Sequence, residues 1–168
     1  LARNLNAPQD LPPFANSSMD GYALRSSDLK ADGTTLKVIL DIAAGTVPAE
    51  ELTAGTCARI MTGAMVPKGA DAVIPVESTN DKSSFQGTKA PDTVIIHKVV
   101  AAGAYIRWPG EDMKAGTQVL PAGQKLTPSM LGVLAAIGQA QVIVYQQPRI
   151  AILASGDELV DASETLGP

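Results

Sequence analysis

Short apolar runs separated by turn-forming residues dominate the chain up to about residue 108. The runs cover residues 36–42, 56–61, 72–76 and 93–100. Each is rich in β-branched residues or bounded by Gly, Pro, Asn or Asp, which is the pattern of strands. Before them, Pro8, Pro12 and Pro13 interrupt residues 1–20 and favour extended backbone over helix. The pattern therefore predicts a β-rich body preceded by an extended segment.

One helix is predicted, over residues 128–137. Thr127 can cap it, and Pro128 occupies the first helical position, where its missing N–H costs nothing. The residues of its apolar face, at helical spacing, are Met130, Val133, Leu134 and Ile137. Gly138 follows as a residue that tolerates the left-handed conformation common at helix ends.

Two further strands are predicted after the helix, at residues 142–145 and 149–155. The second is apolar without alternation, as in a strand buried on both faces of a parallel α/β sheet. A parallel neighbour requires a crossover of a dozen or more residues. Only 13 residues follow Ser155, and they include two glycines and a proline. We therefore expect the chain to be a fragment whose residues 149–168 begin an α/β domain.

Composition and charge exclude several classes of function. The 168 residues are 45% hydrophobic and 18% charged, which are globular values. Thirteen Lys and Arg against 17 Asp and Glu give a net charge of −4 with no basic stripe, so no nucleic-acid partner is expected. The uninterrupted apolar run at residues 130–137 is too short to span a membrane.

Cysteine and histidine counts narrow the metal chemistry. One Cys cannot form a disulfide within the chain, and one His with one Cys cannot build a structural zinc site. A bound metal ion would need oxygen ligands, which points to Mg²⁺. Cys57 is interpreted as a small buried hydrophobe, and His97 as a structural or solvent-facing strand residue.

Acids, a threonine and an arginine at predicted turns are the candidate chemical groups. Asp20 lies among turn-forming residues, and Thr62 begins a small-residue turn whose hydroxyl and N–H groups could hold an anion. Arg107 ends a strand and is followed by Glu111 and Asp112. Adjacent acids in an extended turn point different ways, so we expect that these two do not serve one metal ion. The alternatives are structural: an Asx turn or cap for Asp20, and a solvated turn for the pair of acids.

A last acidic pair follows the apolar run at residues 149–155. Asp157 and Glu158 come directly after Gly156. Loops at the carboxyl ends of parallel strands are where α/β sheets bind ligands. If the expected strand belongs to such a sheet, both acids are candidates for a ligand site.

Taken together and in order, these segments resemble one family. The motifs are Ser-Ser-Met-Asp-Gly-Tyr-Ala at residues 17–23, Ile-Met-Thr-Gly-Ala at residues 60–64, Arg107 followed by Gly-Glu-Asp at residues 110–112, and Gly-Asp-Glu at residues 156–158. They resemble the amino-terminal half of the molybdopterin molybdenumtransferases, the MoeA and gephyrin E-domain family, over nearly the whole chain.

The resemblance implies an activity and its partners. Family members insert molybdate into adenylated molybdopterin and hydrolyse the adenylate with Mg²⁺, which yields molybdenum cofactor. They are cytoplasmic homodimers, with a molybdopterin adenylyltransferase as a possible partner. Their cleft lies between the α/β domain of one subunit and the β-rich domain of the other. A chain without most of the α/β domain is therefore expected to be inactive alone.

The resemblance also implies roles for particular residues. Ser17, Thr62, Arg107 and Glu111 match substrate-binding positions. Asp20, Asp112 and Glu158 match catalytic positions, and the metal ligands would be Asp20 and Asp112. These assignments come from matching motifs and not from the spacing of the residues.

The expected fold class is mixed α+β and β-rich, in a discontinuous two-domain arrangement. Residues 1–20 and 109–148 form a small α+β domain, residues 21–108 form a barrel-like β domain, and residues 149–168 start a truncated α/β domain. The competing hypothesis for function is a non-catalytic, β-rich interaction or dimerisation scaffold. Substitution of Asp20 and Arg107 in the longer parent protein would separate the two hypotheses.

Overall fold

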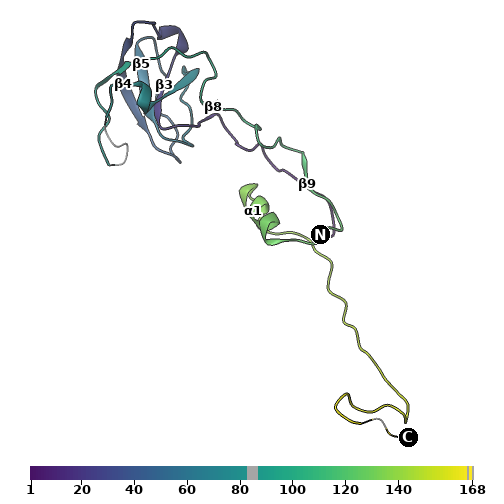
Figure 1. Cartoon of the computed structure of the whole chain (residues 1–168). Coiled ribbons are helices and arrows are strands. Elements are labelled where there is room, and N and C mark those ends of the chain that lie inside the picture. The colour runs from purple at the N-terminus through teal and green to yellow at the C-terminus, as the bar shows by residue number, and fades with distance from the viewer. Residues whose placement is uncertain (83–86, 166, 168) are drawn as a thin grey trace.

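The computed structural model describes residues 1–82, 87–165 and 167, and most of its regular structure is β (Figure 1). In chain order the elements are β1 (Leu5–Asn6), β2 (Asn16–Ser17), β3 (Gly21–Leu24), the 3₁₀ turn η1 (Ser26–Asp28), β4 (Thr34–Ile42), β5 (Thr56–Ile60), β6 (Ala72–Pro75), the 3₁₀ turn η2 (Val76–Ser78), β7 (Thr93–Ile96), β8 (Ile106–Arg107), β9 (Gln118–Leu120) and α1 (Pro128–Ala136). The predicted β-rich, mixed fold class is confirmed.

Five strands form one curled sheet in the order β6-β3-β5-β4-β7. The central pair, β4 and β5, is parallel, and the other pairs are antiparallel. Beyond η2 the chain returns to the far edge: Thr79 bridges Ile96, and the N–H of Asn80 donates to the carbonyl of Ile95 at 3.1 Å. The segment after one edge strand therefore pairs with the opposite edge strand, which closes the body.

Both faces of this sheet are covered, because successive residues of β3 alternate between two apolar clusters. Tyr22 and Leu24 pack in one cluster with Cys57, and Ala23 packs in the other with Ile60. Every residue of β3 and β6 is buried. The prediction that Cys57 is a buried hydrophobe is confirmed.

One cation lies inside the body, and the sequence analysis gave it no role. Arg59 is 1% exposed, although it sits on β5 among apolar neighbours. The parallel register places Asp41 of β4 opposite it, and Arg59 Nε donates to Asp41 Oδ1 at 2.9 Å. A second donor, Nη2, reaches the other oxygen of Asp41 and the carbonyl of Thr88. The hydrogen bonds to Asp41 raise the pKa of Arg59 more than burial lowers it, so the guanidinium stays charged.

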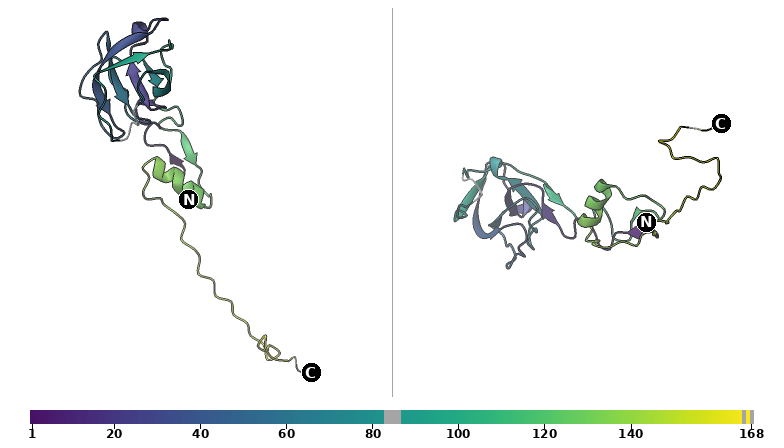
Figure 2. Two further views of the ribbon diagram at one scale, coloured as in Figure 1. Left: turned by 60° about the vertical axis from the view of Figure 1, so that its left-hand side comes forward. Right: turned by 90° about the horizontal axis from the view of Figure 1, so that it is seen from below.

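Two antiparallel segments connect the β-rich body to the part of the chain that holds α1 (Figures 1 and 2). β2 pairs with β8, Leu11 bridges Met113, and β1 pairs with β9. Helix α1 then packs beside the β1–β9 pair, where Leu134 and Ile137 form a small cluster with Leu1 and Leu120. The two segments therefore run side by side along the whole connection.

The predicted helix is confirmed, with two differences in detail. Thr127 has extended backbone at the N-cap, but its hydroxyl makes no capping hydrogen bond and instead lies 3.0 Å from the hydroxyl of Ser129. Val133 is exposed, whereas Leu134 and Ile137 of the same predicted face are buried. Gly138 has the expected left-handed φ of 73°.

Three strand predictions are wrong in whole or in part. The strand expected at residues 93–100 ends at Ile96. Residues 142–145 and 149–155 are not strands, and within the described residues neither stretch pairs with a neighbouring strand. Ile152 is 92% exposed where burial on both faces was expected. A two-sided buried strand exists only when a sheet surrounds it, and the part of the chain that the structure describes places no sheet around residues 149–155.

None of the helices that the structure describes is long and apolar enough to cross a bilayer.

Candidate functional site

Asp20 and Thr62 form a hydrogen-bonded pair at one end of the sheet. Asp20 Oδ1 accepts the Thr62 N–H at 2.7 Å and the Thr62 hydroxyl at 2.8 Å. Both residues are exposed. The other carboxylate oxygen, Oδ2, accepts no hydrogen bond from the described residues, so Asp20 is held by one oxygen and open at the other.

The topology explains why these two residues meet. The parallel strands β4 and β5 end together, with Ile42 opposite Ile60, and the turn that carries Thr62 follows β5 directly. β3 runs antiparallel to β5, with Gly21 opposite Ile60, so Asp20 enters the sheet where β5 leaves it. Two segments about 40 residues apart in sequence thus supply the two halves of the pair.

Ser17 lies beneath this pair and faces inward. It is 1% exposed, its hydroxyl donates to the carbonyl of Met19, and the same oxygen accepts the Met19 N–H at 3.2 Å. Its backbone N–H donates to the carbonyl of Ala64 at 3.0 Å, and its carbonyl accepts the Gly63 N–H at 2.8 Å. The Ser17 hydroxyl therefore serves its own loop in this structure, and its match to a substrate-binding position stays a prediction.

Arg107, Glu111 and Asp112 form a second cluster, at the start of the connection. Arg107 Nη2 donates to Asp112 Oδ1, and Arg107 Nε lies 3.5 Å from Glu111 Oε1. Glu111 Oε2 also accepts the Trp108 N–H at 3.0 Å, which fixes the turn. The expectation that the two acids point different ways is wrong, because the tight turn brings both to one guanidinium.

The charges of this cluster bear on what it can bind. Two carboxylates face one guanidinium, and they raise the pKa of Arg107, mainly through the hydrogen bond to Asp112 and its charge, with a smaller effect of Glu111. Arg107 Nη1 has no partner among the described residues. The cluster can therefore offer one nitrogen to an anion, but its acids oppose that anion.

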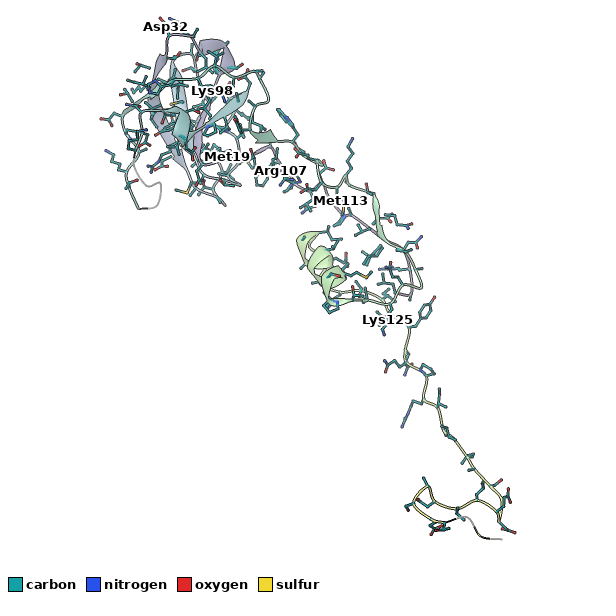
Figure 3. All side chains as sticks on the ribbon, viewed as in Figure 1. Met19, Asp32, Lys98, Arg107, Met113 and Lys125 are labelled. Carbon is teal, nitrogen blue, oxygen red and sulfur yellow. The ribbon has the colours of Figure 1, made fainter. Side chains whose placement is uncertain are left out.

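Backbone pairing brings the two groups to the same end of the β-rich body. Asn16 pairs with Arg107 across β2 and β8, and the N–H of Ser18 donates to the carbonyl of Tyr105 at 3.0 Å. Figure 3 shows Met19 and Arg107 at this end, next to the connection, and Asp32 at the opposite end. Among the described residues, no hydrogen bond or ion pair joins the side chains of Asp20 and Thr62 to those of Arg107, Glu111 and Asp112.

A groove of about 350 Å³ lies beside the Thr62 turn. Its walls are residues 47–51, which follow β4, and residues 65–68, which follow the turn. The walls are mainly apolar, with Glu50, Glu51 and Lys68 at the surface. Asp20 and Thr62 are not among the residues that line this groove.

Glu158 does not join the other candidates. It is exposed in the C-terminal segment, which extends away from the helix and the β-rich body in all views (Figures 1 and 2). Among the described residues, no hydrogen bond links residues 149–165 to the rest of the chain. The structure therefore brings together Ser17, Asp20, Thr62 and the arginine cluster, and leaves Glu158 apart.

The acids of the described residues fit a magnesium ion only as a partial site. Among the described residues there is no group of three or more His, Cys, Asp or Glu that could hold a metal ion. Mg²⁺ is commonly bound through one or two carboxylates together with substrate phosphates, and it keeps several waters. Asp20, with its open Oδ2, fits that kind of partial site. Asp112 is also engaged through Oδ1 only, but the group that engages it is the cation of Arg107, which would lie beside a metal ion bound there.

A further hydrogen-bonded pair near the site was not predicted from the sequence. The buried Tyr22 donates its phenol hydrogen to Asp81 Oδ2 at 2.6 Å, and burial, together with Asp81, raises the pKa of Tyr22. Tyr22 is two residues from Asp20, so this bond anchors the strand that carries the candidate acid. Alternation along β3 indicates that Tyr22 is inward, but nothing in the sequence identifies its partner.

Comparisons with known proteins agree with the motif resemblance. The family described as "MoeA N-terminal region (domain I and II)" matches residues 1–138. Molybdopterin molybdenumtransferase 2 of Mycobacterium tuberculosis is 40% identical over 172 residues, covering 100% of this chain and 40% of that protein. A molybdopterin molybdenumtransferase of Haemophilus influenzae is 39% identical over 165 residues, covering 98% of this chain and 39% of that protein.

Solved structures agree as well. The crystal structure of a molybdopterin biosynthesis MoeA protein from Pyrococcus horikosii matches with a TM-score of 0.82 at 32% identity, covering 99% of this chain and 42% of that chain. The chain thus spans about 40% of the length of the curated relatives that it matches. Since the family match takes in both the β-rich body and helix α1, the chain belongs to the MoeA family, by its N-terminal region.

Proposed function

We propose that the chain supplies the β-rich wall of a site at which molybdate is inserted into adenylated molybdopterin to give molybdenum cofactor. The observation that carries this proposal is the exposed Asp20–Thr62 pair, in which one carboxylate oxygen is fixed and the other is open. The 40% identity to a molybdopterin molybdenumtransferase of Mycobacterium tuberculosis over the whole chain supports the assignment.

The residues of this wall have different proposed roles, which follow from their charges. Asp20 Oδ2 would hold Mg²⁺ or orient a water molecule toward the diphosphate of the substrate. When bound, Mg²⁺ supplies positive charge that neutralises the phosphate oxygens. Thr62 keeps Asp20 in place, and Arg107 Nη1 donates to an oxygen of the phosphate or of molybdate. Glu111 and Asp112 orient Arg107, because both hold its other nitrogens.

The rest of the site comes from outside the β-rich wall. We propose that Glu158 acts from an α/β domain that starts near residue 149, and that the wall of one subunit faces the α/β domain of the other in a homodimer. The boundaries proposed for the two preceding domains are residues 20/21 and 108/109. The pairing of β2 with β8, where the two connecting segments meet the β-rich body, supports these positions. A molybdopterin adenylyltransferase is the proposed supplier of substrate, in the cytoplasm.

Replacing Asp20 in the full-length protein tests the proposal. Asp20→Asn keeps the shape of the side chain but removes the charge, and we expect a loss of roughly 100-fold or more in the rate of molybdenum insertion, as for other groups that act on developing charge. The measurement is the formation of molybdenum cofactor and AMP from adenylated molybdopterin and molybdate. Retention of the full rate would count against the enzyme and favour the scaffold hypothesis.

Asp32→Asn is the matched control. Asp32 is also an exposed loop acid, but Figure 3 shows it at the opposite end of the β-rich body. It should retain the unsubstituted rate. A comparable loss in both variants would show that the effect of Asp20→Asn is not specific to the candidate site.

A further inference from the structure

We propose that Ser17 is a positioning residue for Asp20: its buried hydroxyl closes the loop of residues 17–20 and so sets where the Asp20 carboxylate meets Thr62. This inference rests on the proposed function, in which Asp20 acts on the substrate. It assigns to Ser17 a role that does not require contact with any ligand.

The Ser17 hydroxyl both donates and accepts a hydrogen bond within its own loop. Ser17 is 1% exposed, so a ligand cannot reach its oxygen without displacing the loop. The hydroxyl donates to the carbonyl of Met19 and accepts the N–H of the same residue at 3.2 Å. It thereby fixes both polar groups of the residue that directly precedes Asp20.

Both ends of the loop are tied to the sheet by backbone bonds that do not involve the hydroxyl. Ser17 pairs with the turn after β5, through its N–H to Ala64 at 3.0 Å and its carbonyl to Gly63 at 2.8 Å. Asp20 is held by its carbonyl, which accepts the Val76 N–H at 3.1 Å. Substitution of Ser17 by Ala would leave these anchors and the bonds from Ser18 to the Tyr105 carbonyl in place, and would release only the N–H and carbonyl of Met19.

Releasing the interior of the loop acts on the candidate acid. Without the hydroxyl, the N–H and carbonyl of Met19 lose their partner and turn toward other partners or water. The Asp20 carboxylate depends on alignment with two donors of Thr62, at 2.7 and 2.8 Å. Misplacement of a reacting group by about 1 Å can cost about 100-fold in rate.

Amide hydrogen exchange in the present chain tests the positioning directly. In Ser17→Ala we expect the Thr62 N–H, which donates to Asp20, to exchange about 10-fold faster, in line with the loss of one hydrogen bond. The Met61 N–H, which donates to Ile42 at 3.0 Å, should keep its protection and report an intact sheet. Unchanged exchange at Thr62, or loss of protection at Met61 as well, would overturn the inference.

Thr56→Val provides a matched control. The Thr56 hydroxyl donates to the carbonyl of Thr53 at 2.8 Å and accepts its N–H at 2.9 Å, the same pair of bonds at the other end of β5. Valine preserves the shape of the side chain and removes both bonds. Exchange at Thr62 should stay at the unsubstituted rate, and acceleration there would show that the effect is general and contradict the inference.

Activity of the full-length protein then shows whether Ser17 works through Asp20. Ser17→Ala should lower kcat about 10- to 100-fold, and Ser17→Ala combined with Asp20→Asn should be no worse than Asp20→Asn alone, because residues that act as a unit are not additive. Additive losses, or full activity of Ser17→Ala beside an inactive Asp20→Asn, would overturn the inference and leave the proposed function standing. Full activity of Asp20→Asn would overturn the proposed function, and the exchange result, which needs no activity, distinguishes the two failures.

Discussion

At the residue scale, Tyr22 and Cys57 are both fully buried and both pack in the same apolar cluster. Burial disfavours the ionised form of each side chain and raises its pKa, to about 12 for Cys57. Neither group carries charge in the folded chain near neutral pH. Their energetic effect is therefore felt in alkaline solution, where the unfolded chain can ionise and the folded chain cannot.

The free energy of unfolding should fall as the pH rises above 9. The unfolded chain releases the Cys57 proton near its ordinary pKa of 9.0, while the folded chain keeps that proton up to about pH 12. The unfolded state then binds fewer protons, so stability declines by up to about 1.4 kcal/mol per pH unit for this group. Urea unfolding at pH 8, 9.5 and 11 measures the decline.

Cys57→Ala isolates the contribution of the thiol. This variant is less stable at every pH because it leaves a cavity, but its stability should fall less steeply between pH 9 and 11. Tyr22 is present in both proteins, so the difference in slope belongs to Cys57. Equal slopes would contradict the pKa that burial gives this thiol.

At the element scale, β3 and β6 pack so closely that one position of the sheet accepts no side chain. A Cβ atom on Gly21 would lie 1.9 Å from the carbonyl oxygen of Ile74, which is backbone and cannot rotate away. Gly132, in the middle of helix α1, has nothing within 4 Å of the same position. The same substitution should therefore have opposite effects in the two elements.

Gly21→Ala should destabilise the chain by about 1–3 kcal/mol through overpacking. Gly132→Ala should stabilise helix α1 by about 0.5–1 kcal/mol, because alanine restricts the unfolded backbone more than glycine does. Urea unfolding followed by circular dichroism measures both. A neutral Gly21→Ala would mean that β3 and β6 separate at little cost, and a destabilised Gly132→Ala would mean that the outer side of α1 is covered.

Sequence patterns predicted the elements that local residue types determine. Runs of β-branched residues located β4 to β7, and a capping proline with apolar spacing located α1. Strands β1, β2, β3 and β9 were not predicted, because their pairing depends on distant segments, whereas the strand expected to end at Arg107 is present as β8. The strand predicted at residues 149–155 is wrong for the opposite reason: the composition of these residues suits a buried strand, but a strand also needs neighbouring strands to pair with.

The candidate site shows the same division. Asp20, Thr62 and Arg107 were all chosen from turns, and the structure places them at one end of the body. The convergence of Glu111 and Asp112 on Arg107 was not predictable, because it depends on the conformation of the turn between them. Neither was the buried Arg59, since its partner Asp41 is fixed by parallel register and not by spacing along the chain.

At the scale of the whole molecule, the candidate site is open on the side that faces away from the sheet. Asp20, Thr62 and Arg107 all retain exposed surface, and Glu158 lies in a segment without hydrogen bonds to the body. Electrostatic stabilisation of a reacting group is strongest where water is excluded. An open wall of this kind should bind substrate weakly and should not complete the reaction.

The 168-residue chain should therefore show no molybdenum insertion by itself. The assay supplies adenylated molybdopterin, molybdate and Mg²⁺ and follows the release of AMP and the formation of molybdenum cofactor. The full-length protein, assayed in parallel, is the positive control. Turnover by the isolated chain would show that the described residues already form a complete site and would refute the proposed division between two walls.

The pairing of β2 with β8 also bears on how such a protein can be rearranged. The polypeptide enters the β-rich body beside Asn16 and leaves it beside Arg107, and these two residues are direct neighbours across a ladder. The β-rich body is thus an insertion in the chain, and its first and last residues lie next to each other. Such an insertion can be enlarged, exchanged between relatives or cut out and bridged by a short linker, while the backbone on either side keeps its path. The β2–β8 pair is therefore the place at which another β-rich module can be joined to the helical part, in evolution or by protein engineering.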